Sequence, residues 1–246
     1  MRISVLSLIL AVGPMLVVSP DILAQTAAPS ATARPQPASH PADLTGIWLK
    51  ARSEPTFRFS MEDPPLAPWA LEIYRRNRQG LQNPREQGLD ELDPYTYCYP
   101  MGPTRLMLAG FFHFEIVQLP AKIMLVFEVS NGVRQIFMDG RGHPDGWPFG
   151  WMGHSTGRWD GDTLVVDSVG LNDKTWLDIA GTPHSAGLHV VERFRRVARE
   201  TLEVEFLFED PKAFTKPWGA KRQYQLRPNA ELLEFIVCED QLKMGP

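Results

Sequence analysis

The chain has 246 residues, of which 43% are hydrophobic, and this is enough to bury one sizeable core. Its formal net charge is −4. Lysine and arginine are scattered, and no RNA-binding motif or zinc-finger spacing occurs, which argues against a nucleic-acid-binding module. The two cysteines, Cys98 and Cys238, do not form a CxxC pair, so thiol redox catalysis is not expected.

The first residues have the pattern of a targeting segment. Arg2 precedes an apolar run over residues 5–18, and a cleavage site is plausible after Ala24 or Ala28. We therefore predict a signal peptide over residues 1–24 and a periplasmic or secreted protein. The run is too short for a comfortable membrane span, and no positive flank follows it, so a retained anchor is the less favoured alternative.

Residues 25–43 consist mainly of Ala, Pro, Ser and Thr, and they cannot bury enough apolar surface to fold, which predicts a disordered leader. Residues 44–246 are expected to form a single β-barrel domain. In an oxidising compartment the leading expectation for the cysteines is a Cys98–Cys238 disulfide.

One helix is predicted over residues 63–80, with Asp63 as its cap and an apolar side made of Leu66, Trp69 and Ile73. A connector rich in Pro and Gly follows over residues 84–103, and it must lie on a surface or across a barrel mouth.

The rest of the chain alternates apolar and polar residues, which is typical of strands joined by short turns. Asn131-Gly132 and Asp160-Gly161 are both hairpin signals for type I′ turns. So many neighbouring strands with so little helix favour an all-β, antiparallel up-and-down barrel with long mouth loops, and a sandwich is the alternative. The expected strands, about ten in number, are 45–50, 111–119, 122–130, 133–140, 154–160, 162–169, 187–197, 201–210, 220–227 and 231–240.

Two resemblances bear on the fold. Gly46-x-Trp48 on the first strand resembles the opening motif of lipocalins, in which a tryptophan plugs the closed end of a ligand-holding barrel. From about Gly46 to the C-terminus the chain also resembles a large family of exported bacterial proteins. This second resemblance implies secretion and a lipocalin-like barrel, but no activity. The segments that carry it are IFMDGRGHP, GHSTGRWDGDTLVVDS, PHSAGLHVVERFRR and EDPKAFTKPW.

Reactive side chains concentrate between Asp139 and Glu192. Imidazoles, carboxylates and indoles together can carry out proton chemistry in an aromatic pocket. The stretch holds four of the six histidines and four of the seven tryptophans, namely His143, His154, His184, His189, Trp147, Trp151, Trp159 and Trp176.

Three segments of this stretch are expected to meet at one barrel mouth. The first is a turn in which Arg141 could hold an oxyanion, although Asp139 could simply cap the turn and pair with that arginine. The second is an aromatic loop with Trp147 and Trp151, which ends at His154.

The third segment is a long loop that carries Trp176, Asp178 and His184. We predict that Asp178 orients His184 as a carboxylate–imidazole pair. Ser185 next to His184 does not indicate a serine hydrolase, because no nucleophile elbow is present.

Glu192 has two readings. If its face of the strand points inward, it is a carboxylate among apolar neighbours and is suited to acid–base work, and if outward it is ordinary surface charge. The histidines and carboxylates match no short metal-binding motif.

These residues lead us to expect a cofactor-free acid–base enzyme, an isomerase, hydratase/dehydratase or other lyase. Its substrate would be a small apolar molecule, aromatic or terpenoid-like. The predicted catalytic residues are His154, His184, Asp178, Asp139 and Glu192, and the predicted substrate-binding residues are Arg141, Trp147, Trp151 and Trp176. The alternatives are a periplasmic carrier of an apolar ligand, since barrels serve both roles, and a metal-dependent hydrolase.

Overall fold

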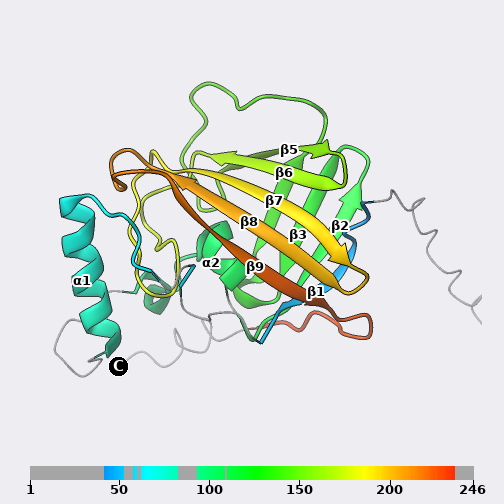
Figure 1. The fold of residues 1–246 in the computed structure, drawn as a ribbon, viewed down its shortest axis with the longest axis horizontal. Helices are drawn as coiled ribbons and strands as arrows, with labels where there is room; N and C mark the ends of the chain where they lie inside the picture. Colours follow the sequence, from blue (N-terminus) through cyan, green and yellow to red (C-terminus); the bar gives the residue numbers. More distant parts are fainter. Residues whose placement is uncertain (1–41, 53–57, 60–61, 83–92, 109, 236–246) are drawn as a thin grey trace, which may run out of the picture. The chain divides into compact units, whose positions relative to one another are not determined.

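The computed structural model describes residues 42–52, 58–59, 62–82, 93–108 and 110–235, which belong to one compact unit spanning residues 39–246 (Figure 1). The predicted signal peptide, nearly all of the predicted leader and Cys238 lie outside the described residues. Ala42 and Leu44 are already buried, so packed structure is present two residues before the predicted start of the domain.

Nine strands close into one barrel in chain order, which confirms the prediction of an all-β barrel. Of the tenth predicted strand, residues 231–235 are not in a strand and the remainder lies outside the described residues. The strands are β1 (Gly46–Lys50), β2 (Phe114–Leu119), β3 (Lys122–Phe127), β4 (Val133–Phe137), β5 (His154–Asp160), β6 (Thr163–Val169), β7 (His189–Ala198), β8 (Thr201–Glu209) and β9 (Trp218–Leu226).

One seam of the barrel departs from the predicted antiparallel pattern. β4 and β5 run parallel, and only Ile136 with Ser155 and Phe137 with Thr156 are paired. Parallel neighbours require a crossover of a dozen or more residues, and residues 138–153 supply it. This connection arches above β5 and β6 as the green loop of Figure 1.

A tight hairpin forms at one of the two signals, but neither turn is the predicted one. Asp160 pairs with Thr163, so β5 and β6 are joined by the tight turn Gly161-Asp162. Gly161 has φ 61° but Asp162 does not have a positive φ, so this turn is not type I′. At the Asn131-Gly132 signal the two-residue type I′ turn is wrong. There the residues with positive φ are Ser130 and Asn131, inside the short η3 helix (Val129–Asn131), and the loop from β3 to β4 is longer.

The predicted helix starts later and faces differently than expected. It is α1 (Pro68–Gln82), with Pro68 at its first position, so Asp63 does not cap it. Its buried side consists of Ala70, Tyr74, Asn77 and Gly80, whereas Trp69 and Ile73 are each 41% exposed. The predicted apolar side is therefore wrong, because the helix packs through small and polar residues.

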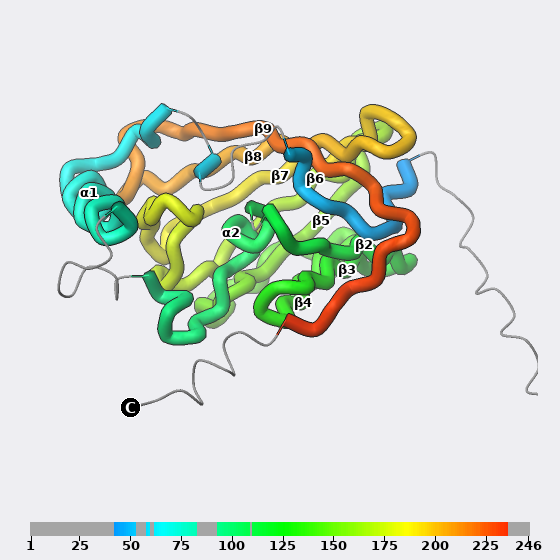
Figure 2. Tube along the Cα trace, turned by 90° about the horizontal axis from the view of Figure 1, so that it is seen from below, coloured from blue at the N-terminus to red at the C-terminus, as the bar shows by residue number. Residues whose placement is uncertain are grey.

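A second helix, α2 (Gly102–Leu108), was not predicted, and all seven of its residues are buried. Figure 2 places it between the β7–β9 side of the barrel and the β2–β4 side. The hydroxyl of Tyr224 on β9 donates to the carbonyl oxygen of Met107 at 3.1 Å, and that of Thr104 donates to the carbonyl of Leu177 at 2.9 Å. The Pro- and Gly-rich connector thus ends in a plug inside the barrel.

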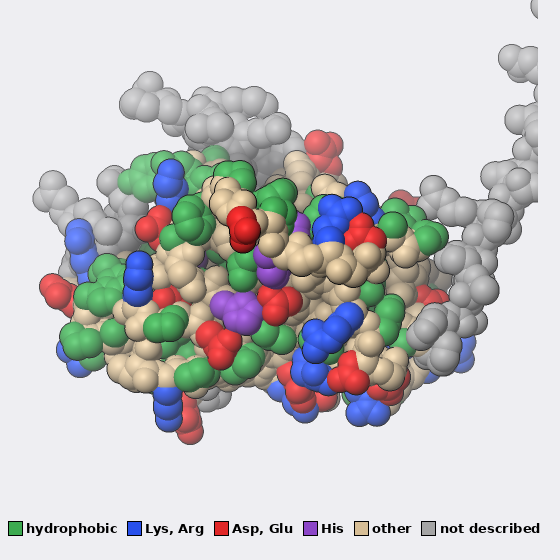
Figure 3. Space-filling view, turned by 90° about the horizontal axis from the view of Figure 1, so that it is seen from above, with side chains coloured by type: hydrophobic (Ala, Val, Ile, Leu, Met, Phe, Trp, Pro, Cys, Tyr) green, Lys and Arg blue, Asp and Glu red, His purple; other side chains and the backbone are tan. Residues whose placement is uncertain are grey.

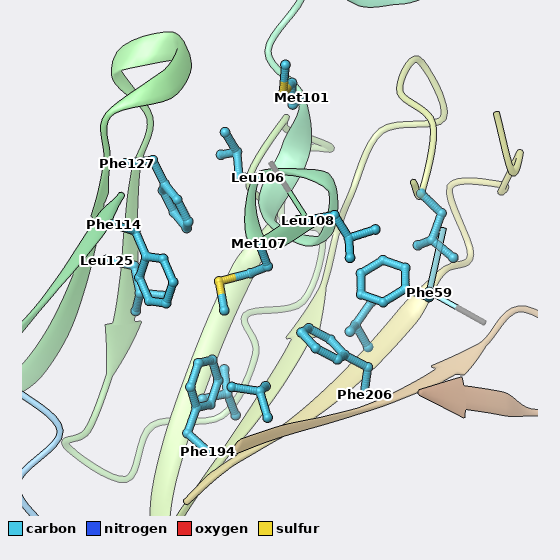
Figure 4. Close-up of a cluster of buried hydrophobic side chains, with 14 of the residues drawn as sticks. Phe59, Met101, Leu106, Met107, Leu108, Phe114, Leu125, Phe127, Phe194 and Phe206 are labelled. Carbon is cyan, nitrogen blue, oxygen red and sulfur yellow. The ribbon is translucent and has the colours of Figure 1, made fainter. Parts of the chain in front are cut away.

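Large side chains fill the space around this plug. In Figure 4, Met107 points between Phe114 and Phe206, with Phe194 below it. Trp48 on β1 is fully buried and donates its indole N–H to the carbonyl of Leu44 at 2.9 Å. The barrel interior around α2 is therefore a packed core.

Among the helices of the described residues, none is both long enough and apolar enough to cross a membrane.

Candidate functional site

The candidate site lies on the outer face of the barrel, across β5, β6, β7 and β8. Side chains alternate between the two faces of a strand, and directly paired residues share a face. Val190 and Glu192 of β7 are buried inside the barrel. His189 directly precedes Val190 in the strand, so its side chain points outward. His189 is paired with Glu209 of β8, which therefore lies on the same outer face.

Asp167 and His154 also face outward, because their inward neighbours Val166 and Ser155 pair with Glu192 and Ser168. The loop 138–153 crosses this face and adds His143. Figure 3 looks onto it and shows histidine side chains beside acidic ones near the middle of the view.

Five side chains form one continuous hydrogen-bonded chain on this face, the histidine–carboxylate chain: His154, His143, Asp167, His189 and Glu209. Nδ1 of His154 lies 2.8 Å from Nδ1 of His143, and Nε2 of His143 lies 2.9 Å from Oδ1 of Asp167. The same oxygen lies 3.1 Å from Nε2 of His189, whose Nδ1 lies 2.8 Å from Oε2 of Glu209.

His154 and His189, on either side of the His143–Asp167 pair in the histidine–carboxylate chain, differ in their surroundings. His154 is only 2% exposed, and this burial lowers its pKa, with electrostatic interactions with His143 and Arg141 acting in the same direction. Burial also acts to lower the pKa of His189, but its hydrogen bonds to Asp167 and Glu209 outweigh that effect and raise it. His154 is therefore a neutral imidazole near pH 7, while His189 holds its second proton more tightly than a free histidine does.

Asp167 is the centre of the chain. Burial acts to raise its pKa, but the hydrogen bonds from His143 and His189 outweigh burial and lower it. An ionised carboxylate only accepts hydrogen bonds, so His143 and His189 both carry a proton on Nε2.

The proton on Nε2 of His143 determines which nitrogen donates in the hydrogen bond between His143 and His154. When His143 is neutral and holds its proton on Nε2, its Nδ1 is an acceptor, and Nδ1 of His154 must donate to it. Nε2 of His154 is then left with a lone pair. Among the residues that the structure describes, none is hydrogen-bonded to Nε2 of His154. A neutral base with a fixed tautomer is what general base catalysis requires.

Aromatic rings enclose this base. The ring of Phe137 stacks on His154 at 5.2 Å between centroids, and Trp147 meets it edge-on at 4.6 Å. Trp147 is itself 39% exposed and stands on the exposed loop 138–153. The structure thus places the predicted Trp147 and His154 together.

Asp139 and Arg141 pair with each other at the start of the same loop. Nε of Arg141 donates to both carboxylate oxygens of Asp139, at 2.8 and 2.9 Å, and its backbone N–H adds a bond at 3.3 Å. The hydrogen bond from the Arg141 side chain lowers the pKa of Asp139, and both residues remain solvent-accessible. Asp139 is an ionised turn residue in this arrangement, while the Arg141 guanidinium lies 4.2 Å from the ring centre of Phe137.

The predicted Asp178–His184 pair does not form. Asp178 accepts the backbone N–H groups of Thr182 at 3.1 Å and Phe59 at 3.4 Å. Nε2 of His184 lies 3.1 Å from Oγ1 of Thr175, and its Nδ1 lies 3.0 Å from the carbonyl oxygen of Ser185. Each side chain is hydrogen-bonded to other groups, mostly of its own loop, which is the ordinary state of a buried polar group.

Burial dominates the proton affinity of both residues. It raises the pKa of Asp178 despite the backbone N–H groups of Thr182 and Phe59, and it lowers the pKa of His184. His184 is therefore a neutral imidazole near pH 7, as is His154, but none of the partners of His154 contacts it.

The remaining tryptophans belong to the His184 side of the molecule. Trp176 lies under the guanidinium of Arg105 at 5.4 Å, and Trp151 contacts Tyr99 at 5.2 Å between ring centres. A pocket of about 240 Å³ brings Trp176 and His184 together with Trp69 and Ile73 of α1. The exposed face of α1 therefore borders this pocket. The nine predicted site residues thus separate into groups instead of meeting at one mouth.

Glu192 does point into the barrel, but it is not isolated among apolar groups. It receives both guanidinium nitrogens of Arg134, one of them at 2.9 Å. The hydroxyls of Ser155 and Ser168 bond the same guanidinium at 3.2 and 2.8 Å. Glu192 is a partner in a buried ion pair inside the barrel, across the wall from the histidine–carboxylate chain.

Sequence reasoning missed His143, Asp167, His189 and Glu209 as site residues because it placed the site at a barrel mouth. These side chains lie on the outer face of the barrel wall instead. The alternation of HVVER and the pairing of neighbouring strands would have put His189 and Asp167 on one outer face.

Within the described part of the chain, no group of three or more His, Cys, Asp or Glu side chains is placed to hold a metal ion.

Comparison with protein-family models, curated proteins and solved structures found no match to this chain.

Proposed function

We propose that this protein is a cofactor-free acid–base enzyme in which His154 is the base. The observation that carries the proposal is the hydrogen-bonded series from Asp167 through His143 to His154. It leaves a lone pair on Nε2 of a neutral, buried imidazole. Nothing in a stable fold requires two imidazoles to be joined in this way, since either could bond a backbone carbonyl instead.

The proton balance of the proposed step is as follows. Nε2 of His154 takes a proton from a substrate C–H or O–H, and the bonding electron pair stays on the substrate. His154 then passes its Nδ1 proton to Nδ1 of His143. His143 becomes an imidazolium that is stabilised by ionised Asp167. Return of the proton to another substrate atom completes an isomerisation. In a dehydration the substrate electron pair forms the new double bond, and the proton is delivered to the departing hydroxyl, which leaves as water.

The surroundings of His154 support a small, largely apolar substrate, aromatic or terpenoid-like. Phe137 and Trp147 supply flat aromatic walls on two sides of the imidazole. Exclusion of water by these rings strengthens electrostatic interactions at the base. Arg141, whose positive charge acts on His154, would stabilise an oxyanion formed when the proton leaves.

The test is proton exchange into a panel of small apolar ketones and β-hydroxy carbonyl compounds in D₂O, followed by mass spectrometry. We expect His154→Asn to lose about 100-fold or more of the exchange rate of wild type, because general bases contribute roughly 10²–10⁴-fold. Asparagine keeps a polar group near the position of Nδ1, so the bond to His143 can survive, and circular dichroism checks the fold.

The matched control is His113→Gln. His113 also pairs with a carboxylate, that of Glu128 at 3.3 Å, but it takes no part in the histidine–carboxylate chain. This variant is expected to keep the wild-type rate. A folded His154→Asn protein with full exchange activity would overturn the assignment of the base.

A second candidate function is carriage of an apolar ligand, and one observation favours it. Trp69 and Ile73 are exposed on α1, and they line the pocket of about 240 Å³ with Trp176 and His184. A ligand that is recovered unchanged from the exported protein, and that the Ile73→Gln variant no longer binds, would support carriage. Absence of exchange with every panel compound, together with such a ligand, would favour carriage over catalysis.

We also propose export through the predicted signal peptide, a Cys98–Cys238 disulfide and a lipocalin-like barrel. The Arg2 and apolar-run pattern supports export, and the fully buried Trp48 in the first strand supports the lipocalin-like barrel. Mass spectrometry of the exported protein, before and after reduction, would test the cleavage site and the disulfide together.

A further inference from the structure

The far end of the histidine–carboxylate chain is built unlike a surface ion pair. His189 lies between two carboxylates and touches one with each ring nitrogen, Glu209 through Nδ1 at 2.8 Å and Asp167 through Nε2 at 3.1 Å. Both contacts are within hydrogen-bond distance, and an ionised carboxylate can only accept. Both nitrogens must therefore carry protons, which is the imidazolium form.

We propose that His189 is a positioning residue: a charged imidazolium, clamped between Glu209 and Asp167, that sets the orientation and proton affinity of the His143–His154 pair. This inference deepens the acid–base function proposed above and rests on it. His189 does not touch the substrate. It acts through Oδ1 of Asp167, which accepts hydrogen bonds from His189 and His143 together.

Orientation is the first consequence of the clamp. Asp167 is partly exposed on a strand, where a lone carboxylate can rotate in solvent. With its Oδ1 held by His189, the carboxylate is fixed where Nε2 of His143 must donate to it. The tautomer of His143 follows, and the lone pair on Nε2 of His154 follows from that tautomer.

Proton affinity is the second consequence. The positive charge of His189 partly offsets the negative charge of Asp167 as felt by His143 and His154. It therefore makes a proton on that pair less favourable and keeps the base unprotonated at lower pH. The charged groups facing His189 are Asp167 from β6 and Glu209 from β8, with Asp210 and Lys216 lining the same pocket of about 480 Å³.

The charge state is tested by ¹⁵N NMR of the histidine rings in the full-length protein, measured from pH 5 to 9. We expect both ring nitrogens of His189 to stay protonated at a pH where a free histidine, with a pKa of about 6.5, has lost one proton. A coupling between the two Nδ1 atoms across the hydrogen bond should link His143 to His154. Wild-type His189 titrating as a free histidine does would overturn the inference.

Two variants test the action at a distance. Glu209→Gln removes one of the two carboxylates, so His189 should lose its proton at lower pH than in wild type. His189→Gln removes the cation, so the titration of His154 should move to higher pH. The acid limb of the kcat profile should move in the same direction, with KM unchanged for any substrate found by the exchange assay.

Glu205→Gln is the matched control. Glu205 lies on the same outer face of β8 but pairs with Lys221 at 2.7 Å, so its loss should leave every histidine titration in place. An unchanged His154 titration in folded His189→Gln protein would overturn the positioning role. That outcome would leave the assignment of His154 as the base standing, since that assignment depends on the exchange test with His154→Asn.

Discussion

Arg134 and Glu192 show how burial determines the role of a charged side chain in this barrel. The sequence allowed two roles for Glu192, an inward acid–base group or an outward surface charge. The structure has it inward but pairs it with Arg134, and both side chains are almost completely buried. Strand alternation indicated the two faces, but the partner is 58 residues away in the sequence and no local pattern could identify it.

We expect Glu192→Gln to lower the free energy of unfolding by about 3–5 kcal/mol, because it leaves the buried Arg134 without its counter-charge. The double variant Arg134→Met/Glu192→Met should recover most of this loss, since an apolar pair avoids the desolvation of both ions. Urea denaturation measures both. An exposed pair is the control: Asp160→Asn, which breaks the contact with Arg193 at 3.0 Å, should change stability by less than about 1 kcal/mol. Equal losses for the two pairs would contradict the argument.

At the scale of elements, the strands were predictable, whereas of the two α-helices only α1 was predicted, and with a different start and buried face. All nine strands overlap strands predicted from alternation and turn signals, and their order round the barrel is the order along the chain. α2 escaped prediction because its GPTRLML segment is short and wholly buried, so it has no amphipathic pattern. The direction of β5 relative to β4 depends on the path of residues 138–153, which local periodicity does not encode.

α1 provides a test of which of its faces matters. Nδ2 of Asn77 donates to the carbonyl of Gly181 at 2.8 Å in a buried contact, and Asn77→Ala removes this bond. We expect it to cost about 1–3 kcal/mol in the free energy of unfolding, because a buried carbonyl loses its donor. Ile73→Gln, on the exposed face of the same helix, should change stability by no more than about 0.5 kcal/mol. Thermal denaturation of both variants shows which face of α1 contributes more to stability. A larger loss of stability for Ile73→Gln than for Asn77→Ala would support the packing face predicted from the sequence.

At the scale of the whole molecule, most of the candidate site lies in the stretch of chain that the sequence singled out, but on the outer face of the barrel instead of at its mouth. Residues 139–192 do hold His154, His143, Asp167 and His189. The expectation of a ligand-holding barrel put the site at the mouth, opening onto an interior where α2 and the aromatic core lie. The inside was unavailable because a buried helix, unforeseen in the sequence, fills it.

The buried and clamped histidines give the molecule a stability optimum in pH. His154 and His184 have lowered pKa values, so as pH falls through about 6.5 the unfolded chain binds protons that the folded one does not. Stability therefore declines toward acid. His189 has a raised pKa, so its contribution is complete below about 6.5 and is lost as pH rises through the raised value.

We expect His184→Gln to lose less stability than wild type between pH 7 and 5.5, and His189→Gln to lose less between pH 7 and 8.5. Urea denaturation at the three pH values measures the differences. The prediction would be contradicted if the stability of His184→Gln fell toward acid pH as steeply as that of wild type does.

The parallel seam between β4 and β5 has a kinetic consequence for the proposed base, His154. It is joined by two residue pairs, whereas the neighbouring β5–β6 seam has seven. Local opening of a barrel begins where the fewest backbone bonds must break. His154 is the first residue of β5, next to that seam. A brief parting of two strands, far cheaper than unfolding, would then let water and small molecules reach an imidazole that the resting structure encloses, so the rate of this breathing would set an upper limit on turnover.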